Sequence, residues 1–257
     1  MKKANRYAII SLTTGLMIFA SLPQNVMARI GETPKESTTD QNQVAPPTDA
    51  KPQGQQPLVY KSIVEAVYKG DIEDVKQHLL NGANVNEASD SFYHNTLMHI
   101  AADSGNLEMV KLLLTNHADV NIRTDAGSTP LGSAVASHHP EMVKLLINNG
   151  ADVNAKDRDD NTALHIAAWG TNINLEVVKL LINNKADVNA TNHKGNTALH
   201  DAAKNNEDNN LGMVILLVDN KADANAKNND GDTALNIAAK NENSKIVAFL
   251  RSRPAKE

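Results

Sequence analysis

Histidine is the residue type in this sequence whose number and positions could support catalysis or metal binding. The chain has nine histidines and no cysteine, so disulfides and thiolate chemistry are excluded. His138 and His139 are adjacent, but adjacent residues of a helix point in different directions, and no cysteine or nearby acidic cluster completes a zinc site around them. No nucleophile–base pair, phosphate-binding glycine loop or zinc-ligand spacing occurs elsewhere. The sequence therefore predicts no catalytic residue, no metal and no cofactor, and it favours a protein that is not an enzyme.

Three other histidines belong to a repeated phrase, Thr-x-[Leu/Met]-His. They are His99, His165 and His200, whereas Gly132 and Asn236 take the histidine's place in two further copies. The threonines of the five copies are 33, 33, 35 and 36 residues apart. A second phrase, Ala-Asp-Val-Asn or a close variant, precedes each threonine and begins at Ala83, Ala118, Ala151, Ala186 and Ala222. Self-similarity at this period predicts a repeat architecture.

The two phrases and their period of about 33 residues resemble the ankyrin repeat. The resemblance covers residues 58–253 and implies an all-α repeat solenoid, in which pairs of antiparallel helices are followed by projecting fingers like β-hairpins. It also implies that the histidine of each phrase hydrogen-bonds within and between repeats, so this ladder should have gaps at Gly132 and Asn236. A repeat array has an elongated surface and no single enclosed core, and such surfaces bind other proteins.

The first 28 residues have the features of a secretory signal peptide. Residues 1–6 are basic, residues 8–22 form an uncharged apolar run, and Val26-Met27-Ala28 provides the −3 and −1 positions of a cleavage site. The alternative is an uncleaved anchor helix, although a run this short barely spans a bilayer. Cleavage after Ala28 removes three basic residues, leaving 22 basic and 30 acidic ones, so the net charge changes from −5 to −8.

Composition and phrase positions divide the rest of the chain. Residues 29–57 are rich in Pro, Gln and Thr and predict a disordered tether, with a recognition tail as the less favoured reading. Residues 58–86 predict an N-terminal capping repeat. Five repeats follow, with first helices that start near residues 96, 129, 162, 197 and 233. The last repeat acts as a C-terminal cap, and residues 254–257 form a tail.

Each outer helix is expected to end at a residue with a left-handed backbone, just before the Ala-Asp-Val-Asn phrase. Gly82 and Gly150 adopt this conformation freely. His117, Lys185 and Lys221 hold the same place in the other repeats, where a side chain costs roughly 1 kcal/mol relative to glycine.

The binding surface of the ankyrin family resembles a concave palm made of finger tips and the ends of the first helices. By motif position this surface would include Arg123, Asp125, Lys156, Arg158, His193 and Lys194 on the fingers, and Asp103, Ser104, Trp169 and Lys204 at the helix ends. Phe92 and Tyr93 are added because they lie in a first finger that is two residues longer than the next. The alternatives are that Trp169 packs under its own lengthened turn, that the first finger folds back on the cap, and that the basic residues are simply solvated.

Charge and repeats together predict the class of function. A negative net charge and a pI near 6.0 argue against a nucleic-acid partner. We expect an exported bacterial protein that is monomeric, has no stable membrane anchor after cleavage, and binds a protein partner through the concave face. It would be periplasmic in a Gram-negative cell and secreted otherwise. The alternatives are an accessory or protective subunit of an enzyme in the same compartment, and a secreted effector that acts on host proteins.

Overall fold

The computed structural model describes residues 57–91, 93–169, 173–204 and 208–253. Within these ranges the chain forms α-helices and no β-strand, apart from one isolated bridge between Ala88 and Thr96. The helices are α1 (Ile63–Lys69), α2 (Ile72–Leu80), α3 (Leu97–Asp103), α4 (Leu107–Thr115), α5 (Pro130–Ala136), α6 (Pro140–Asn148), α7 (Ala163–Ala168), α8 (Leu175–Asn183), α9 (Ala198–Ala202), α10 (Asp208–Asp219), α11 (Ala234–Lys240) and α12 (Ser244–Ser252). The all-α repeat fold expected from the two phrases is confirmed.

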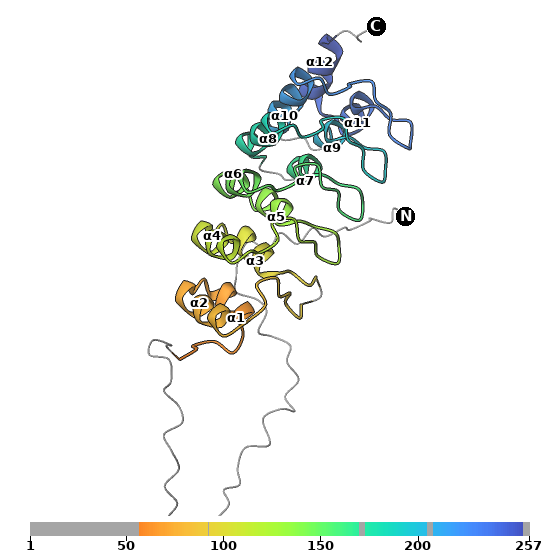
Figure 1. The fold of residues 1–257 in the computed structure, drawn as a ribbon. Coiled ribbons are helices and arrows are strands. Elements are labelled where there is room, and N and C mark those ends of the chain that lie inside the picture. The colour runs from red at the N-terminus through yellow and green to blue at the C-terminus, as the bar shows by residue number, and fades with distance from the viewer. Residues whose placement is uncertain (1–56, 92, 170–172, 205–207, 254–257) are drawn as a thin grey trace, which may run out of the picture. The chain divides into compact units, whose positions relative to one another are not determined.

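The helices alternate between two layers (Figure 1). The odd-numbered helices form the inner layer, the even-numbered helices form the outer layer, and each helix contacts the next one in its own layer. Repeats 1 to 5 begin with α3, α5, α7, α9 and α11. The loop that leads into each of these inner helices projects as a finger beside the inner layer (Figure 1).

The repeated threonine explains where each inner helix begins. Thr96, Thr129, Thr162, Thr197 and Thr233 are the N-cap residues of α3, α5, α7, α9 and α11, all with extended backbones. At Thr129 and Thr233 the hydroxyl accepts an amide of the first turn, from Gly132 at 3.2 Å and from Asn236 at 3.3 Å. The small residues that follow, such as Ala167 and Ala168, are buried, which allows neighbouring inner helices to approach closely.

The outer helices end as expected, in left-handed turns. The φ angles are 87° at Gly82 and 89° at Gly150, and 64° at His117, 69° at Lys185 and 72° at Lys221. Three residues with a Cβ atom are therefore held in a conformation that favours glycine.

The asparagine of each of the first four Ala-Asp-Val-Asn phrases joins its repeat to the next one. Asn121 Oδ1 accepts a hydrogen bond from the amide of Asp152 at 2.8 Å, and Asn121 Nδ2 donates to the carbonyl of Gly150 at 3.0 Å. The amides of Asp119, Asp187 and Asp223 donate in the same way to Asn86, Asn154 and Asn189. The phrase is thus a joint between repeats as well as a turn.

Several predicted segments lie outside the described residues: the signal peptide (1–28), the tether up to residue 56, Phe92 and the tail (254–257). Among the helices that the structure describes, none is both long and apolar enough to cross a membrane.

Candidate functional site

The end of each inner helix presents one exposed residue at the same place in every repeat. These residues, seven positions after each threonine, are Asp103, Ala136, Trp169, Lys204 and Lys240, and we refer to them as the inner-helix row. The row runs from an acidic residue in repeat 1, through a small and an aromatic residue, to two lysines in repeats 4 and 5. Consecutive members of the row belong to neighbouring repeats, and the inner helices of neighbouring repeats contact one another.

Trp169 is the large apolar member of this row. It is the C-cap residue of α7, and its side chain remains 41% exposed. The neighbouring Ala167 and Ala168 are buried, so the inner layer at this point is already filled by small side chains. An exposed aromatic residue outside the core is more informative about binding than about packing.

Backbone hydrogen bonds hold the tips of the later fingers together. The amide of Arg158 donates to the carbonyl of Ala126 at 3.0 Å, the amide of His193 donates to Asp159 at 2.8 Å, and Asn229 donates to Lys194 at 3.0 Å. Each of these bonds connects one finger with the next. The side chains of Arg158, His193 and Lys194 remain exposed on this connected backbone.

Other finger residues predicted to face a partner use their side chains inside the array. A guanidinium nitrogen of Arg123 donates to the carbonyl of Lys156, and Lys156 Nζ donates to the carbonyl of Thr191 at 3.0 Å. Asp125 Oδ2 lies 2.5 Å from His94 Nδ1 on the first finger. Tyr93, the described member of the aromatic pair, is 61% exposed on that finger. The finger surface is therefore braced by three of its own predicted binding residues.

The repeated histidines form the expected ladder between repeats. The Thr96 hydroxyl donates to His99 Nδ1 at 2.8 Å, and His99 Nε2 donates to the carbonyl of Ser128 in the next repeat at 3.0 Å. His165 pairs in the same manner with Thr162 and the carbonyl of Asn196, and His200 with Thr197 and the carbonyls of Ala226 and Asp232. This geometry requires Nδ1 to accept and Nε2 to donate, as in a neutral imidazole.

Burial lowers the pKa of all three ladder histidines below the ordinary value. Carbonyl acceptors oppose the shift in each case, and the nearby charge of Asp201 also raises the pKa of His165 and His200. Desolvation remains the largest cause, so these imidazoles are neutral links between repeats.

The two expected gaps in the ladder differ. At Gly132 the gap is complete: Thr129 Oγ1 accepts only the glycine amide, at 3.2 Å, and a cavity of about 10 Å³ lies beside Gly132 and Ile166. At Asn236 the expectation was too strong. Asn236 Oδ1 accepts both the amide and the hydroxyl of Thr233, at 3.0 and 2.9 Å, so the bond within the repeat survives. An amide side chain can reproduce the short inner contact of imidazole.

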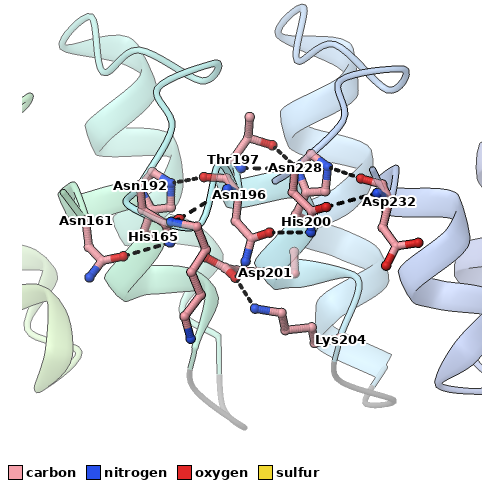
Figure 2. A network of polar contacts seen from close by, with 12 residues as sticks. Asn161, His165, Asn192, Asn196, Thr197, His200, Asp201, Lys204, Asn228 and Asp232 are labelled. Atoms are coloured by element: carbon pink, nitrogen blue, oxygen red, sulfur yellow. Dashed lines mark hydrogen bonds and ion pairs between the residues drawn. The ribbon is translucent and has the colours of Figure 1, made fainter. Parts of the chain in front are cut away.

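A polar network that the sequence analysis missed crosses repeats 3 to 5 (Figure 2). Asn192 Nδ2 donates to Asn161 Oδ1, and Asn228 Nδ2 donates to Asn196 Oδ1, both at 2.9 Å. Asn196 Nδ2 also donates to Asp201 Oδ1 at 3.1 Å. Asp201 stands where α3, α7 and α11 have Ile100, Ile166 and Ile237. A charged residue at an isoleucine position was the available signal.

Lys204, predicted as a surface contact, belongs to the same network. Its Nζ lies 2.5 Å from Asp201 Oδ1, and its side chain is 44% exposed whereas that of Asp201 is 1% exposed. The structure therefore brings Lys204 together with a buried carboxylate and places both one repeat after Trp169. Among the described residues, no group of three or more His, Cys, Asp or Glu side chains is arranged to hold a metal ion.

Comparison with known proteins agrees with this architecture. A family model described as ankyrin repeats (3 copies) matches residues 63–157, 100–192 and 164–256. A mouse protein, 2-5A-dependent ribonuclease, is 39% identical over 69 residues, which is 27% of this chain and 9% of the mouse protein. The match therefore covers a small part of the mouse protein, and the ribonuclease activity in that protein's name refers to the mouse protein alone. Because the matched stretches together extend over most of the chain and coincide with the stacked helix pairs and fingers, the protein belongs to the ankyrin-repeat family.

Proposed function

We propose that this chain is an exported, non-enzymatic scaffold that binds a protein partner through the inner-helix row and the finger tips. Ankyrin repeats generally mediate protein–protein interaction and typically act without catalysis. The observation that supports this particular surface is Trp169, which is 41% exposed at the centre of the row. Tryptophan is among the residues that most often dominate binding energy at interfaces.

The rigidity of the surface also supports the proposal. Hydrogen bonds join neighbouring finger tips, and the histidine ladder links α7 to the loop before α9, so these described parts of the face need little ordering when a partner binds. A pre-organised surface loses less free energy on binding than a flexible one.

Export is a separate part of the proposal and rests on the sequence of residues 1–28. Cleavage after Ala28 would give a mature chain that begins at Arg29. Intact-mass analysis of the protein recovered from its native cells tests this. A dominant species that retains Met1, or one cut far from Ala28, would contradict export by this route.

Proximity labelling with the mature chain in its native cells identifies the partner, and two variants test the surface. Trp169→Ala should weaken binding at least about tenfold, since loss of an interface tryptophan often costs about 2 kcal/mol or more. The melting temperature should change little, because the side chain lies outside the buried core.

Lys111→Glu is the matched control on the outer layer. Lys111 is exposed on α4 and borders a hollow of about 320 Å³ between α4 and α6. Binding should be unaffected by this charge reversal. If Lys111→Glu abolishes binding, or if Trp169→Ala unfolds the protein, the proposed face is wrong. A labelled partner that is itself an enzyme would identify the chain as that enzyme's accessory subunit.

A further inference from the structure

Asp201 is a buried charge in a place where the other repeats do not have one. Three of the other four repeats have isoleucine here, and repeat 2 has Ser133. The Asp201 side chain is 1% exposed. Burying a carboxylate is costly unless hydrogen bonds and a counter-charge replace the lost water, so Asp201 destabilises the array to the extent that its partners do not compensate it.

The hydrogen bonds of this carboxylate are unevenly distributed. Oδ1 accepts from Asn196 Nδ2 at 3.1 Å and from Lys204 Nζ at 2.5 Å. Oδ2 is buried and has no hydrogen-bond donor among the described residues. One half of the carboxylate is therefore satisfied, while the other half can still accept.

The cation that neutralises Asp201 comes from the surface. Lys204 reaches it from the next turn of the chain, with a side chain that is 44% exposed (Figure 2). His165 and His200 are close enough to feel the charge of Asp201, but burial keeps both rings neutral by lowering their pKa. Lysine is a compact cation on a flexible stem and lacks the planar fork of arginine, so Lys204 can exchange with a guanidinium.

Trp169 supplies the second element of the site. It precedes Lys204 by one repeat in the inner-helix row, and α7 and α9 are in contact. Asn196 connects the carboxylate to α7, because its side chain donates to Asp201 Oδ1 at 3.1 Å while its carbonyl accepts from His165 of α7 at 2.9 Å. An exposed indole and a half-satisfied carboxylate therefore belong to adjacent, contacting helices.

We propose that Asp201 and Trp169 bind an arginine side chain of the protein partner, and that Lys204 occupies the carboxylate until this arginine displaces it. The inference rests on the proposed function and names the chemistry of the partner. Arginine fits better than lysine because its planar guanidinium can stack on an aromatic ring while one of its N–H groups donates to Asp201 Oδ1, the oxygen that Lys204 contacts. The net charge of −5, or −8 after cleavage, also favours a basic partner.

A small arginine probe tests the site without knowledge of the partner. We would titrate N-acetyl-arginine amide into ¹⁵N-labelled protein and follow the Trp169 indole signal and the Asn196 side-chain amide. N-acetyl-citrulline amide has the same shape without the charge, and N-acetyl-lysine amide has the charge without the planar group. The arginine probe should shift both signals at lower concentration than the other two.

Two variants act on the site in opposite directions. Lys204→Met removes the competing cation and should tighten binding of the arginine probe about two- to fivefold, which is the range expected for a partly exposed ion pair. Asp201→Asn keeps an acceptor for Asn196 but removes the charge, and it should weaken binding at least about tenfold. Asp232→Asn is the matched control, because Asp232 also pairs with a lysine, Lys240, at 2.5 Å, but it is partly exposed and lies outside this site.

The outcomes separate this inference from the proposed function. Tighter binding by Lys204→Met together with weaker binding by Asp201→Asn supports the arginine site. Equal binding of the citrulline and arginine probes, or no gain in Lys204→Met, overturns it even if Asp201→Asn fails to fold. If the arginine probe shifts neither signal, the arginine site is overturned, whereas the proposed function is still tested separately by the effect of Trp169→Ala on capture of the protein partner.

Discussion

Repeats 2 and 4 have the same helix plan, yet their inner helices bury opposite kinds of side chain. In repeat 2, α5 has Gly132 where the ladder histidine is expected, and a cavity of about 10 Å³ is lined in part by Gly132 and by Ile166 of the next repeat. In repeat 4, α9 has both His200 and Asp201, which bond to the preceding loop and to the following repeat. The link from repeat 2 to repeat 3 at this level is apolar, whereas the links from repeat 3 to 4 and from 4 to 5 are polar.

This difference indicates that the array is not uniformly cohesive. In a repeat protein, stability is roughly a sum of repeat and interface contributions. The histidine ladder and the asparagine network strengthen the interfaces of repeats 3 to 5, which also hold Trp169 and Asp201. The proposed binding region thus lies on the more strongly connected part of the described chain.

Removal of a ladder histidine should lower the free energy of unfolding more than any other change considered below. His200→Ala leaves Thr197 and two carbonyls of the next repeat without their partner and creates a void, at a cost of about 2 to 4 kcal/mol. Urea denaturation measures this change. His193→Ala, on an exposed finger tip, is the control and should change the free energy of unfolding by less than about 0.5 kcal/mol. Equal effects of the two variants would show that the ladder adds no stability.

Acidification should weaken the interfaces that contain a ladder histidine and spare the interface between repeats 2 and 3, where Gly132 takes the histidine's place. The folded-state pKa of His99, His165 and His200 is lowered by burial, so the unfolded chain binds protons first as the pH falls. Their contribution is complete above the unfolded pKa of about 6.5 and is lost progressively below it. Denaturation midpoints at pH 7.5 and 6.0 measure the loss, which should be smaller than that of His200→Ala.

The same comparison can be made within the histidine ladder. Asn236 shows that an asparagine keeps the bond within the repeat without a ring that titrates. His200→Asn should therefore reduce the dependence of stability on pH. An unchanged dependence would assign the effect to other groups.

The turns after the outer helices favour repeat 2 over repeat 4, because the turn of repeat 2 has glycine at its left-handed position and the turn of repeat 4 has lysine. The left-handed residue after α6 is Gly150, whereas those after α8 and α10 are Lys185 and Lys221, at φ angles of 69° and 72°. Lys185→Gly and Lys221→Gly should each stabilise the fold by up to about 1 kcal/mol, because a left-handed backbone is strained with a Cβ atom. The effects should add nearly independently, since the sites are in different repeats. Denaturant melts of the single and double variants would contradict this if both single changes destabilise.

Features that recur were predictable from the sequence, and features that occur once were not. Thr96 and Asn121 belong to phrases whose repetition reveals both the helix starts and the joints. Asp201 occurs at one copy of its position and had no second example to support it. The bonds of Arg123 and Lys156 to neighbouring fingers depend on the spacing of those fingers, which the sequence does not specify. The place of Trp169 in the inner-helix row followed from motif position alone.

The asparagine joints have a consequence for how such a gene can change length. Asn86, Asn121, Asn154 and Asn189 all receive the amide of the next Asp at 2.8 to 2.9 Å, so the joints are nearly interchangeable. A deletion of residues 119–151 would bring Asp152 to the place of Asp119, where Asn86 could accept its amide. Loss or duplication of one repeat in the gene therefore preserves the joint between the repeats on either side. The number of repeats can thus change in evolution independently of the side chains that face a partner.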